Sequence, residues 1–461
     1  MTPNKSLLLS QQINSLMQRN LLQIIEPLFP HKVVENYRKD QELNSRDRIF
    51  NEEITLLTMI ISAIHEDKTL QNSVNILQEI HTKSIDKIIK YSQKQVEEEK
   101  LHDLKNNQSK VGRPKLYRQR IKKSKIQPIS SNTAAYSKAR KRLDLKLIDE
   151  VFNVTKDFRE VITDAKWRQR DVFITDGTYF QMQDSEELKH KYSVRKNLSG
   201  KKFAYPQGLL QAIIHQGTGS VFEYQISSRG HSELELLFPL MEKIPKKSLL
   251  LADDLYNSFI VFALLAERQI DIIVPGKRKR IYQVIDKIGS DDEIIEITRS
   301  AWPSWLRKDY LLPTKLTLRR IRYTDVNNPQ EEHVIYTSIL DKSINKNEII
   351  NKYNTRWDIE ITIREIKTLM GISIARSKTE EMVFKEMKVA LIAYNLLRKV
   401  IAQASTGSAF SPKEDIIQEY FETCKNTLID KKGRVYNRWS PGRYTNSFSQ
   451  SSKTLNTNKT L

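Results

Sequence analysis

The sequence has one cysteine, few glycines and no long apolar run, and each shortage excludes a class of protein. The single thiol, Cys424, excludes an internal disulfide framework and a cysteine-based zinc site, and predicts a reducing, cytoplasmic location. Only 13 glycines among 461 residues argue against phosphate binding by glycine-rich loops. The longest apolar run, residues 259–266, is far shorter than the roughly 18 residues of a membrane-spanning helix, and we expect no signal peptide.

Acidic residues are also scarce relative to basic ones. The chain has 76 Lys and Arg against 56 Asp and Glu, a formal net charge of +20. Such an excess attracts a polyanion: nucleic acid is the first candidate, an acidic membrane surface is the second, and a generally basic proteome is the neutral alternative. With 39% hydrophobic residues the chain can build packed cores, and its length allows about three domains at roughly 150 residues each.

The positive charge is concentrated in one stretch. Residues 104–143 contain 13 Lys or Arg and no Asp or Glu. Within it, Gly112-Arg113-Pro114-Lys115 is similar to the core of an AT-hook, whose arginine enters the narrow minor groove of A·T-rich DNA; a solvated linker explains these residues equally well. A helix predicted from Ser131 onward could lie along a phosphate backbone. We therefore predict DNA contacts for four basic residues: Arg113, Lys115, Arg140 and Arg142.

Composition and periodicity divide the chain into five predicted segments. Apolar residues recur at helical spacing in the first 90 residues, for example at Ile54, Leu57, Ile61 and Ile64. The last segment ends in a basic tail without acidic groups. In order, the segments are a helical N-terminal domain (1–103), a basic linker with DNA-binding helices (104–165), an α/β core in two pieces (166–277 and 332–400), a β-rich insertion between them (278–331), and a C-terminal helix with the basic tail (401–461).

The predicted core begins with three strands in hairpin order, at 171–176, 208–216 and 221–228, and then alternates between helix and strand. This order predicts a mixed sheet with helices on its faces. After the insertion, a strand at 332–339 returns to the core. A long helix then begins at its cap Asn345 and runs to Met370, just before Gly371.

Carboxylates are the candidate catalytic groups, since the common phosphate-loop, nucleophile-elbow and zinc-protease motifs are absent. Asp176 ends the first predicted strand, and Asp253 follows the strand predicted at 248–252. At about 100° per residue, one face of the long helix carries four more polar groups within about 60° of arc: Tyr353, Arg356, Glu360 and Lys367. Such a face can bind a metal ion beside phosphates, or it can be an exposed face with incidental i,i+4 pairs.

These residues together resemble the signatures of the insertion-sequence-four family of bacterial DDE transposases. The matching motifs are Asp176-Gly177-Thr178 followed by Asp184, Leu251-Ala252-Asp253 with Tyr256, and Tyr353-x2-Arg356-x3-Glu360-x6-Lys367. The last motif matches the family pattern at every spacing, and the resemblance covers residues 130–400 well. It implies an α/β fold with a ribonuclease-H-like catalytic core, a mixed sheet and a β-rich insertion, preceded by a helical N-terminal domain.

The resemblance also implies the chemistry of the site. Asp176, Asp253 and Glu360 would be the catalytic triad and would hold two Mg²⁺ ions, for which Mn²⁺ would substitute. Tyr353, Arg356 and Lys367 would contact phosphates around the scissile bond. Trp302 or Trp305 would stack on a flipped base, although each could equally be core of the insertion. Of the neighbouring acids, Asp184 is expected to be structural, and Asp358 and Glu365 are expected to face solvent.

The resemblance finally implies what the protein does. We expect a DNA transposase that binds the terminal inverted repeats of its insertion sequence, cleaves the ends and joins them to double-stranded target DNA. By the same resemblance it would act as a homodimer in the synaptic complex, at the bacterial nucleoid and without membrane contact.

One motif departs from the family pattern. Where the family usually has Asp-Arg-Gly-Tyr, this chain has Asp253-Asp254-Leu255-Tyr256. The metal ligand is therefore open between Asp253 and Asp254, and we favour Asp253 because it directly follows the apolar strand. The altered motif also motivates an alternative function, a catalytically impaired transposase-derived DNA-binding protein. A cellular nuclease of the same fold is a third possibility.

Overall fold

A computed structural model describes most of residues 21–42, 50–78, 130–162, 165–192, 205–228, 231–277, 280–299, 302–325 and 328–406, with scattered positions between 82 and 101. The AT-hook-like residues Gly112-Arg113-Pro114-Lys115 and the cysteine Cys424 lie outside the described residues, as does the basic tail. None of the described helices has the length and apolar character needed to cross a membrane.

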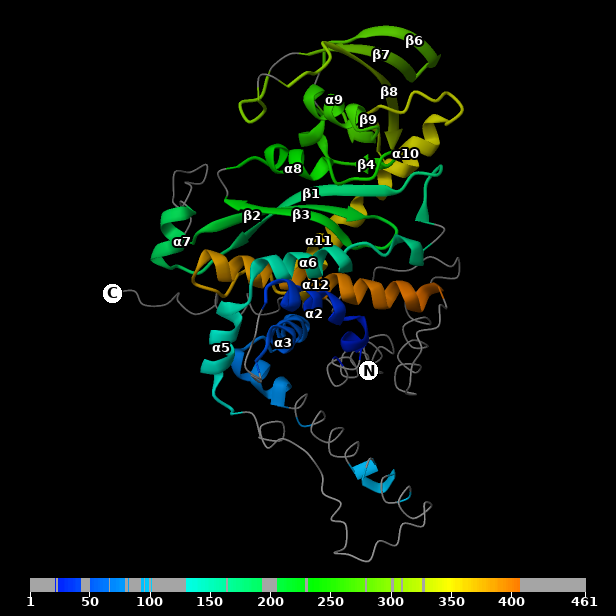
Figure 1. Cartoon of the computed structure of the whole chain (residues 1–461). Coiled ribbons are helices and arrows are strands. Elements are labelled where there is room, and N and C mark those ends of the chain that lie inside the picture. Colours follow the sequence, from blue (N-terminus) through cyan, green and yellow to red (C-terminus); the bar gives the residue numbers. More distant parts are fainter. Residues whose placement is uncertain are drawn as a thin grey trace, which may run out of the picture.

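One sheet of nine strands runs through the described part of the chain, in the order β3-β2-β1-β4-β5-β9-β8-β7-β6 (Figure 1). β1 pairs antiparallel with β2 and parallel with β4, β4 is parallel to β5, and the other pairs are antiparallel. The mixed sheet expected from the strand order is therefore confirmed. The strands are β1 (Val172–Gln181), β2 (Gln207–His215), β3 (Val221–Ser228), β4 (Leu249–Leu251), β5 (Asp271–Pro275), β6 (Gln283–Gly289), β7 (Asp292–Thr298), β8 (Lys315–Asp325) and β9 (Asn328–Thr337).

Helices cover the sheet, and further helices come from the N-terminal part of the chain. Several begin at a polar side chain that accepts a hydrogen bond from the first turn, such as Ser232, Ser258 and Asn345. The helices are α2 (His31–Asp40), α3 (Glu52–Ile64), α5 (Thr133–Arg142), α6 (Leu145–Thr155), α7 (Glu186–Lys191), α8 (Glu233–Met241), α9 (Phe259–Glu267), α10 (Lys346–Asn354), α11 (Asp358–Leu369) and α12 (Glu380–Thr406), with 3₁₀ turns η1 (Glu26–Leu28), η3 (Arg159–Val161), η5 (Asp254–Tyr256) and η6 (Thr355–Trp357).

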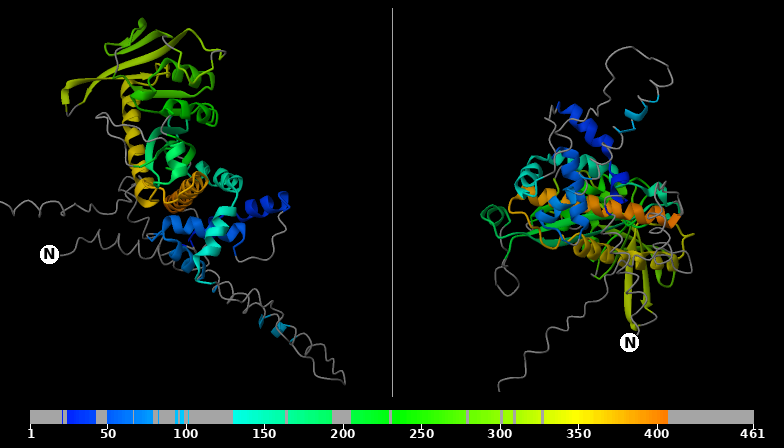
Figure 2. Two further views of the ribbon diagram at one scale, coloured as in Figure 1. Left: turned by 90° about the vertical axis from the view of Figure 1, so that its left-hand side faces the viewer. Right: turned by 90° about the horizontal axis from the view of Figure 1, so that it is seen from below.

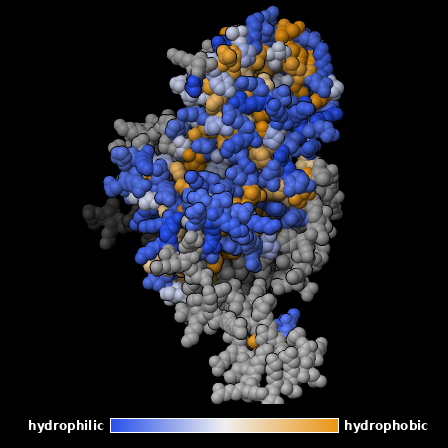
Figure 3. All heavy atoms as spheres, viewed as in Figure 1, coloured by the Kyte–Doolittle hydropathy of each residue, from blue (hydrophilic) through white to orange (hydrophobic). Residues whose placement is uncertain are grey.

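The two faces of the sheet bury two different hydrophobic clusters. Along β1, Val172 and Ile174 join the cluster that also contains residues of α6, α11 and α12, whereas Phe173 joins the cluster of α8 and α9. Successive side chains of a strand point to opposite faces, so this alternation assigns α11 to the face on which even-numbered β1 residues lie. The exterior seen in Figure 3 is mostly hydrophilic, with hydrophobic residues gathered near β6 to β9.

The N-terminal helices share the core of the sheet. α3 packs against α12 and α5, and α2 packs against α6. Because α3 is surrounded in this way, its residues from Thr55 to Ile64 are buried almost without interruption. Leu21 and Ile60 belong to the same hydrophobic cluster as Val172 of β1. Figure 2 shows these helices at one end of the molecule and β6 to β9 at the other.

The strands of the predicted insertion are continuous with the core sheet. β9 pairs with β5 on one side and with β8 on the other. Arg319 of β8 is fully buried and binds the carboxylate of Asp292 through two bonds of 2.8 and 2.6 Å. Its Nη1 also donates to the carbonyls of Asp341 and Ile344. This buried guanidinium therefore ties the extended sheet to the loop that leads into α10.

The prediction of one continuous helix between Asn345 and Met370 was wrong, because the helix is interrupted in its interior. The ends are as expected: Asn345 caps α10, and Gly371 has a positive φ of 65°. Between them, α10 stops at Asn354 and the 3₁₀ turn η6 precedes α11. Thr355 contributes to the break, because its hydroxyl donates to the carbonyl of Lys352 at 2.6 Å.

Candidate active site

The register of β1 and β4 brings two of the expected carboxylates together. Ile174 pairs with Leu251, and Asp176 and Asp253 each lie two residues beyond this pair. In extended backbone this spacing places both on the face of Ile174, which is the face of α11. Asp176 does not end its strand as expected, because β1 continues to Gln181. It is instead the pairing with β4 that ends before Asp176, and the strands then separate.

The hydrogen bonds of the two adjacent aspartates differ. Asp253 caps the turn η5, where its Oδ1 accepts from the amide of Leu255 at 2.9 Å. Asp254 turns to the neighbouring strand end, where its Oδ1 accepts from the amide of Lys277 at 3.0 Å. Asp253 is also one of the charges that raise the pKa of Asp176. These contacts favour Asp253 as the partner of Asp176.

The helix α11 contains Glu360 and Lys367 of the Tyr-Arg-Glu-Lys motif and lies on the face of β1 that carries Asp176. It packs against β1, and its first turn contains Glu360. Glu360 Oε1 lies 3.5 Å from Nη2 of Arg356, as expected for i,i+4 neighbours. The Nε atom of Arg356 is buried and has no hydrogen-bond partner among the described residues. Its guanidinium also lies over the ring of Trp357, 5.3 Å from the centroid.

The electrostatics connect these residues into one site. Burial raises the pKa of Asp176 to about 6, and the charges of Glu233 and Asp253 also raise it while Arg356 opposes them. Burial lowers the pKa of Lys367, and the charge of Asp176 works against that decrease. Burial raises the pKa of Tyr353, whose hydroxyl lies beside Arg356 and senses Asp253. Arg356 and Lys367 therefore interact electrostatically with Asp176, and Tyr353 with Asp253.

Glu233 is a further acid of the site that the sequence did not reveal. It occupies the first turn of α8, and its Oε2 accepts a hydrogen bond of 2.9 Å from the hydroxyl of Tyr256. Burial and the charge of Asp253 raise the pKa of Glu233, while the bond from Tyr256 lowers it. The signal in the sequence is slight, because Ser232-Glu233 resembles any capped helix start.

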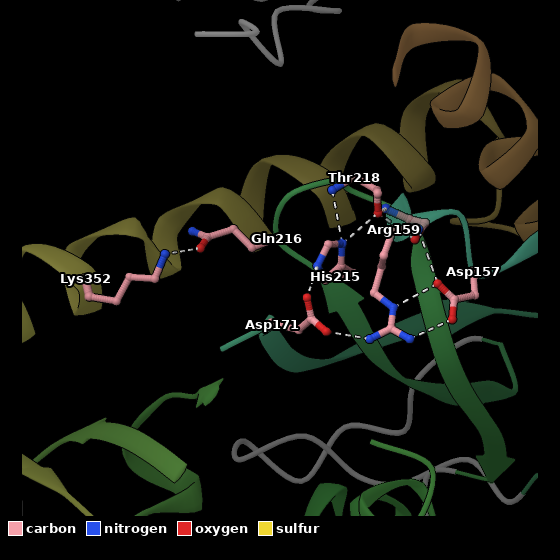
Figure 4. A network of polar contacts seen from close by, with 8 residues as sticks. Asp157, Arg159, Asp171, His215, Gln216, Thr218 and Lys352 are labelled. Carbon is pink, nitrogen blue, oxygen red and sulfur yellow. Dashed lines mark hydrogen bonds and ion pairs between the residues drawn. The ribbon is translucent and has the colours of Figure 1, made fainter. Parts of the chain in front are cut away.

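The junction between α10 and α11 is held by a side chain from the turn after β2. Gln216 accepts a bond of 2.6 Å from Lys352 and donates to the carbonyl of Thr355 and to Asp358 at 3.4 and 3.2 Å. Figure 4 shows Gln216 and Lys352 beside the buried His215. Asp358 is therefore half-buried and hydrogen-bonded, so the expectation that it faces solvent was wrong.

The remaining residues of this network fix the turn itself. His215 Nδ1 bonds to the hydroxyl of Thr218 at 3.0 Å, and burial lowers the pKa of His215 to about 4. Arg159 bridges the carboxylates of Asp157 and Asp171 (Figure 4). A neutral histidine and a paired arginine form a rigid support rather than a catalytic group.

The far end of α11 is also anchored. Glu365 is buried and accepts from the hydroxyl of Tyr394 in α12 at 3.2 Å, which corrects the expectation that it faces solvent. Burial raises its pKa to about 7. Beyond α11, Gln181 at the end of β1 exchanges backbone hydrogen bonds with Ser373 and Ala375. α11 is thus fixed to the sheet at both ends.

The two candidate tryptophans pack within the extended sheet region. Trp302 Nε1 donates to the carbonyl of Leu306 at 2.8 Å, and Trp305 packs against Phe238. Both are partly buried beside the cluster of α8 and α9. Trp357, inside the motif, is 59% exposed and is a further aromatic surface that sequence reasoning missed. Asp184 pairs with Lys189 at 3.0 Å on the surface.

The described part of the predicted DNA-binding segment includes α5, which carries Arg140 and Arg142. Arg142 is exposed, whereas Arg140 is half-buried and lies over the ring of Tyr136. Arg140 also lines a pocket of about 340 Å³ together with Lys68 and Arg376. Burial and the nearby charge of Arg376 lower the pKa of Lys68 to about 8. Three cations and one acid, Glu386, therefore line one hollow, formed by segments distant in sequence.

The carboxylates fit a hard divalent cation by their chemistry. Mg²⁺ and Mn²⁺ bind oxygen donors where negative charge is in excess. The charges of Glu233 and Asp253 raise the pKa of Asp176, and the charge of Asp253 raises the pKa of Glu233, as such an excess requires. Within the described ranges, however, no three His, Cys, Asp or Glu side chains lie close enough together to form a metal site. The described carboxylates therefore belong to one site but do not by themselves form a complete set of metal ligands.

Comparison with known proteins defines the class. Residues 167–396 match the family model of the transposase DDE domain. Over 322 residues, 67% of this chain and 69% of the relative, the sequence is 26% identical to transposase InsG for insertion sequence element IS4 of Escherichia coli (strain K12). The matched region contains every strand described above and the whole acidic site. The chain therefore belongs to the insertion-sequence-four family of DDE transposases.

Proposed function

We propose that this transposase works by cut-and-paste: it binds the terminal inverted repeats of its insertion sequence, cleaves the ends by metal-dependent phosphoryl transfer and joins them to target DNA. The observation that carries the proposal is the meeting of Asp176 and Asp253 beyond the last pair of β1 and β4, on the face packed by α11. We assign the strand order β3-β2-β1-β4-β5 with its covering helices to a ribonuclease-H-like core, and the helices before it to an N-terminal domain.

In this proposal Asp176, Asp253 and Glu360 are the catalytic triad. When bound, two Mg²⁺ or Mn²⁺ ions would supply charge stabilisation to the attacking and leaving oxygens of an in-line displacement. Asp176 would contribute to both ions, with Asp253 on one side and Glu360 on the other. Glu360 contacts Arg356 through Oε1 alone, at 3.5 Å, so its other acceptor positions remain for an ion.

The cations of the motif would then hold the DNA. Arg356 has a buried Nε without a partner among the described residues, and a phosphate oxygen is the acceptor that would satisfy it. Lys367, whose pKa is affected by the charge of Asp176, would bind a phosphate next to the scissile bond. Tyr353 lies beside Arg356 and would contact the same backbone. Exposed Trp357, or Trp302 or Trp305, would provide a surface on which an unstacked base packs.

Further contacts are proposed outside the acidic site. Arg140 and Arg142 of α5, together with Arg113 and Lys115, would bind the DNA backbone at the transposon ends. A homodimer would hold two ends in the synaptic complex, and the protein would reside at the nucleoid. The rival, a catalytically impaired DNA-binding protein, rests on the Asp254-Leu255 departure. The hydrogen bond from Lys277 to Asp254 favours a supporting role for that acid, which leaves Asp253 for catalysis.

Strand cleavage in vitro tests the proposal. The substrate is a labelled duplex with the inverted repeats found beside the gene, incubated with Mg²⁺ or Mn²⁺. Asp176→Asn, Asp253→Asn and Glu360→Gln should each abolish nicking and leave binding within a few fold, because they remove ligands for the ions and not DNA contacts. Asp254→Asn is the matched control and should retain cleavage. Failure of the unmodified protein to nick the duplex would favour the rival function.

A further inference from the structure

Glu233 reaches β1 from the face opposite α11. Its carboxylate lies over Gly177, where an added Cβ would come within 2.4 Å of Glu233 Cδ. Only glycine at this position leaves the space that the carboxylate occupies. Gly177 directly follows Asp176, at the point where β1 no longer pairs with β4. The absence of a side chain at Gly177 therefore lets a carboxylate from α8 lie next to Asp176, and its charge raises the pKa of Asp176.

A chain of buried hydrogen bonds orients this carboxylate. The side-chain amide of Gln211 donates to the hydroxyls of Thr175 and Tyr256, at 2.8 and 2.9 Å. The shorter of the two bonds available to the Tyr256 proton, at 2.9 Å, goes to Glu233. The chain thus presents a donor to Glu233, as an ionised carboxylate requires. The hydroxyl of Tyr256 and the backbone amide of Gly177 use two of about four acceptor positions on this carboxylate and leave the others for a cation.

Glu233 differs in its partners from a carboxylate with a structural role. Glu223 on β3 is buried and is neutralised by Lys156 and Lys243. In the part of the chain that the structure describes, Glu233 has no such ion pair, although burial and Asp253 both work against its charge. Glu233 is half-buried, accepts a hydrogen bond and has no lysine or arginine among the described residues to balance its charge. Such a carboxylate can bind a cation from solution.

We propose that Glu233 is a fourth carboxylate of the active site and a ligand of its divalent cation, with Tyr256 as the residue that positions it. The inference rests on the proposed function, because Asp176 and Asp253 are the other ligands. It adds a group that the transposase motif does not contain. Glu233 would add a carboxylate from α8, next to Gly177, to those of Asp176 and Asp253.

The experiment measures binding of Mn²⁺ to the DNA-free protein, by the electron paramagnetic resonance signal of the free ion during titration. Glu233→Gln should weaken binding roughly tenfold or more, and Tyr256→Phe should weaken it less, as removal of an orienting partner does. Glu235→Gln is the matched control: it removes a charge from the same helix turn, where Glu235 pairs with His231, and should bind Mn²⁺ as the unmodified protein does. Far-ultraviolet circular dichroism and thermal unfolding in EDTA verify that each variant is folded.

Asp176→Asn separates failure of this inference from failure of the proposed function. If Asp176→Asn no longer binds Mn²⁺ and Glu233→Gln still does, Glu233 is not a ligand and the proposed function stands. If the unmodified protein binds no Mn²⁺ and does not nick its end duplex, both are overturned. If Glu233→Gln does not fold, Glu233→Asp decides: a carboxylate one methylene shorter should weaken Mn²⁺ binding, and undiminished binding would overturn the inference.

Discussion

The raised pKa of Asp176 has a consequence for the stability of the folded protein. Its value of about 6 in the folded protein exceeds the ordinary value of 3.8 because the carboxyl is buried beside two other acids. Between these two values the folded state binds a proton that the unfolded state has released. Stability consequently falls as pH rises through this window, and the decrease is complete above about pH 6.

Because stability falls as Asp176 ionises, we predict that Asp176→Asn stabilises the protein near neutral pH. In EDTA at pH 7 the variant should be more stable than the unmodified protein by about 1 to 3 kcal/mol, since one pKa unit corresponds to about 1.4 kcal/mol. The difference should vanish below about pH 4, where the native carboxyl is neutral. Urea unfolding at several pH values measures it. Asp184→Asn, at an exposed surface pair, is the control and should show no gain at pH 7; a gain for Asp176→Asn that did not change with pH would contradict the argument.

Gln216 makes a prediction about the α10–α11 junction. Gln216→Ala removes three hydrogen bonds at this point and leaves the half-buried Lys352 and Asp358 without this partner. We expect a decrease of about 1 to 3 kcal/mol in unfolding free energy and faster hydrogen exchange at residues 355–360. Cleavage should fall because Arg356 and Glu360 lie on this segment.

The control for this variant is Gln71→Ala. Gln71 is an exposed glutamine whose bonds to Asn75 and Ser131 are long, at 3.2 and 3.3 Å. It should change stability by less than about 0.5 kcal/mol. If exchange at 355–360 were the same in Gln216→Ala as in the unmodified protein, the junction would be held by the helices alone.

These elements also show what the sequence could predict. Periodicity and capping depend on a few neighbouring residues. The sequence could therefore predict the hairpin strands β2 and β3 and the helix cap Asn345. The turn η6 was missed because Gln216, 139 residues away, helps to set it. Glu365 was placed in solvent because its burial depends on Tyr394 of α12. Glu233 was missed because only the register of the sheet brings it to Gly177.

Across the whole molecule, the positive charge is distributed unevenly. In the acidic site the charge of Asp176 acts on Lys367 and is opposed by that of Arg356. Lys68, Arg140 and Arg376 line a separate hollow, together with Glu386. Residues 104–143 hold 13 basic residues and no acid. This positive charge would attract DNA of any sequence, because binding by counterion release depends on charge and not on base sequence.

Salt dependence of DNA binding tests whether residues 104–143 bind phosphates. Replacing Arg113, Lys115, Lys122 and Lys123 with Ala should weaken binding to an end duplex and lower the slope of log K against log salt, by roughly 0.9 for each phosphate that is no longer neutralised. Fluorescence anisotropy between roughly 50 and 200 mM salt measures this slope. A charge-matched control replaces four exposed lysines that pair with acids elsewhere, Lys39, Lys94, Lys315 and Lys342. Because the control removes the same net charge, an equal fall in slope for both variants would mean that DNA senses only the total charge, whereas a fall confined to the first places phosphates on the basic stretch.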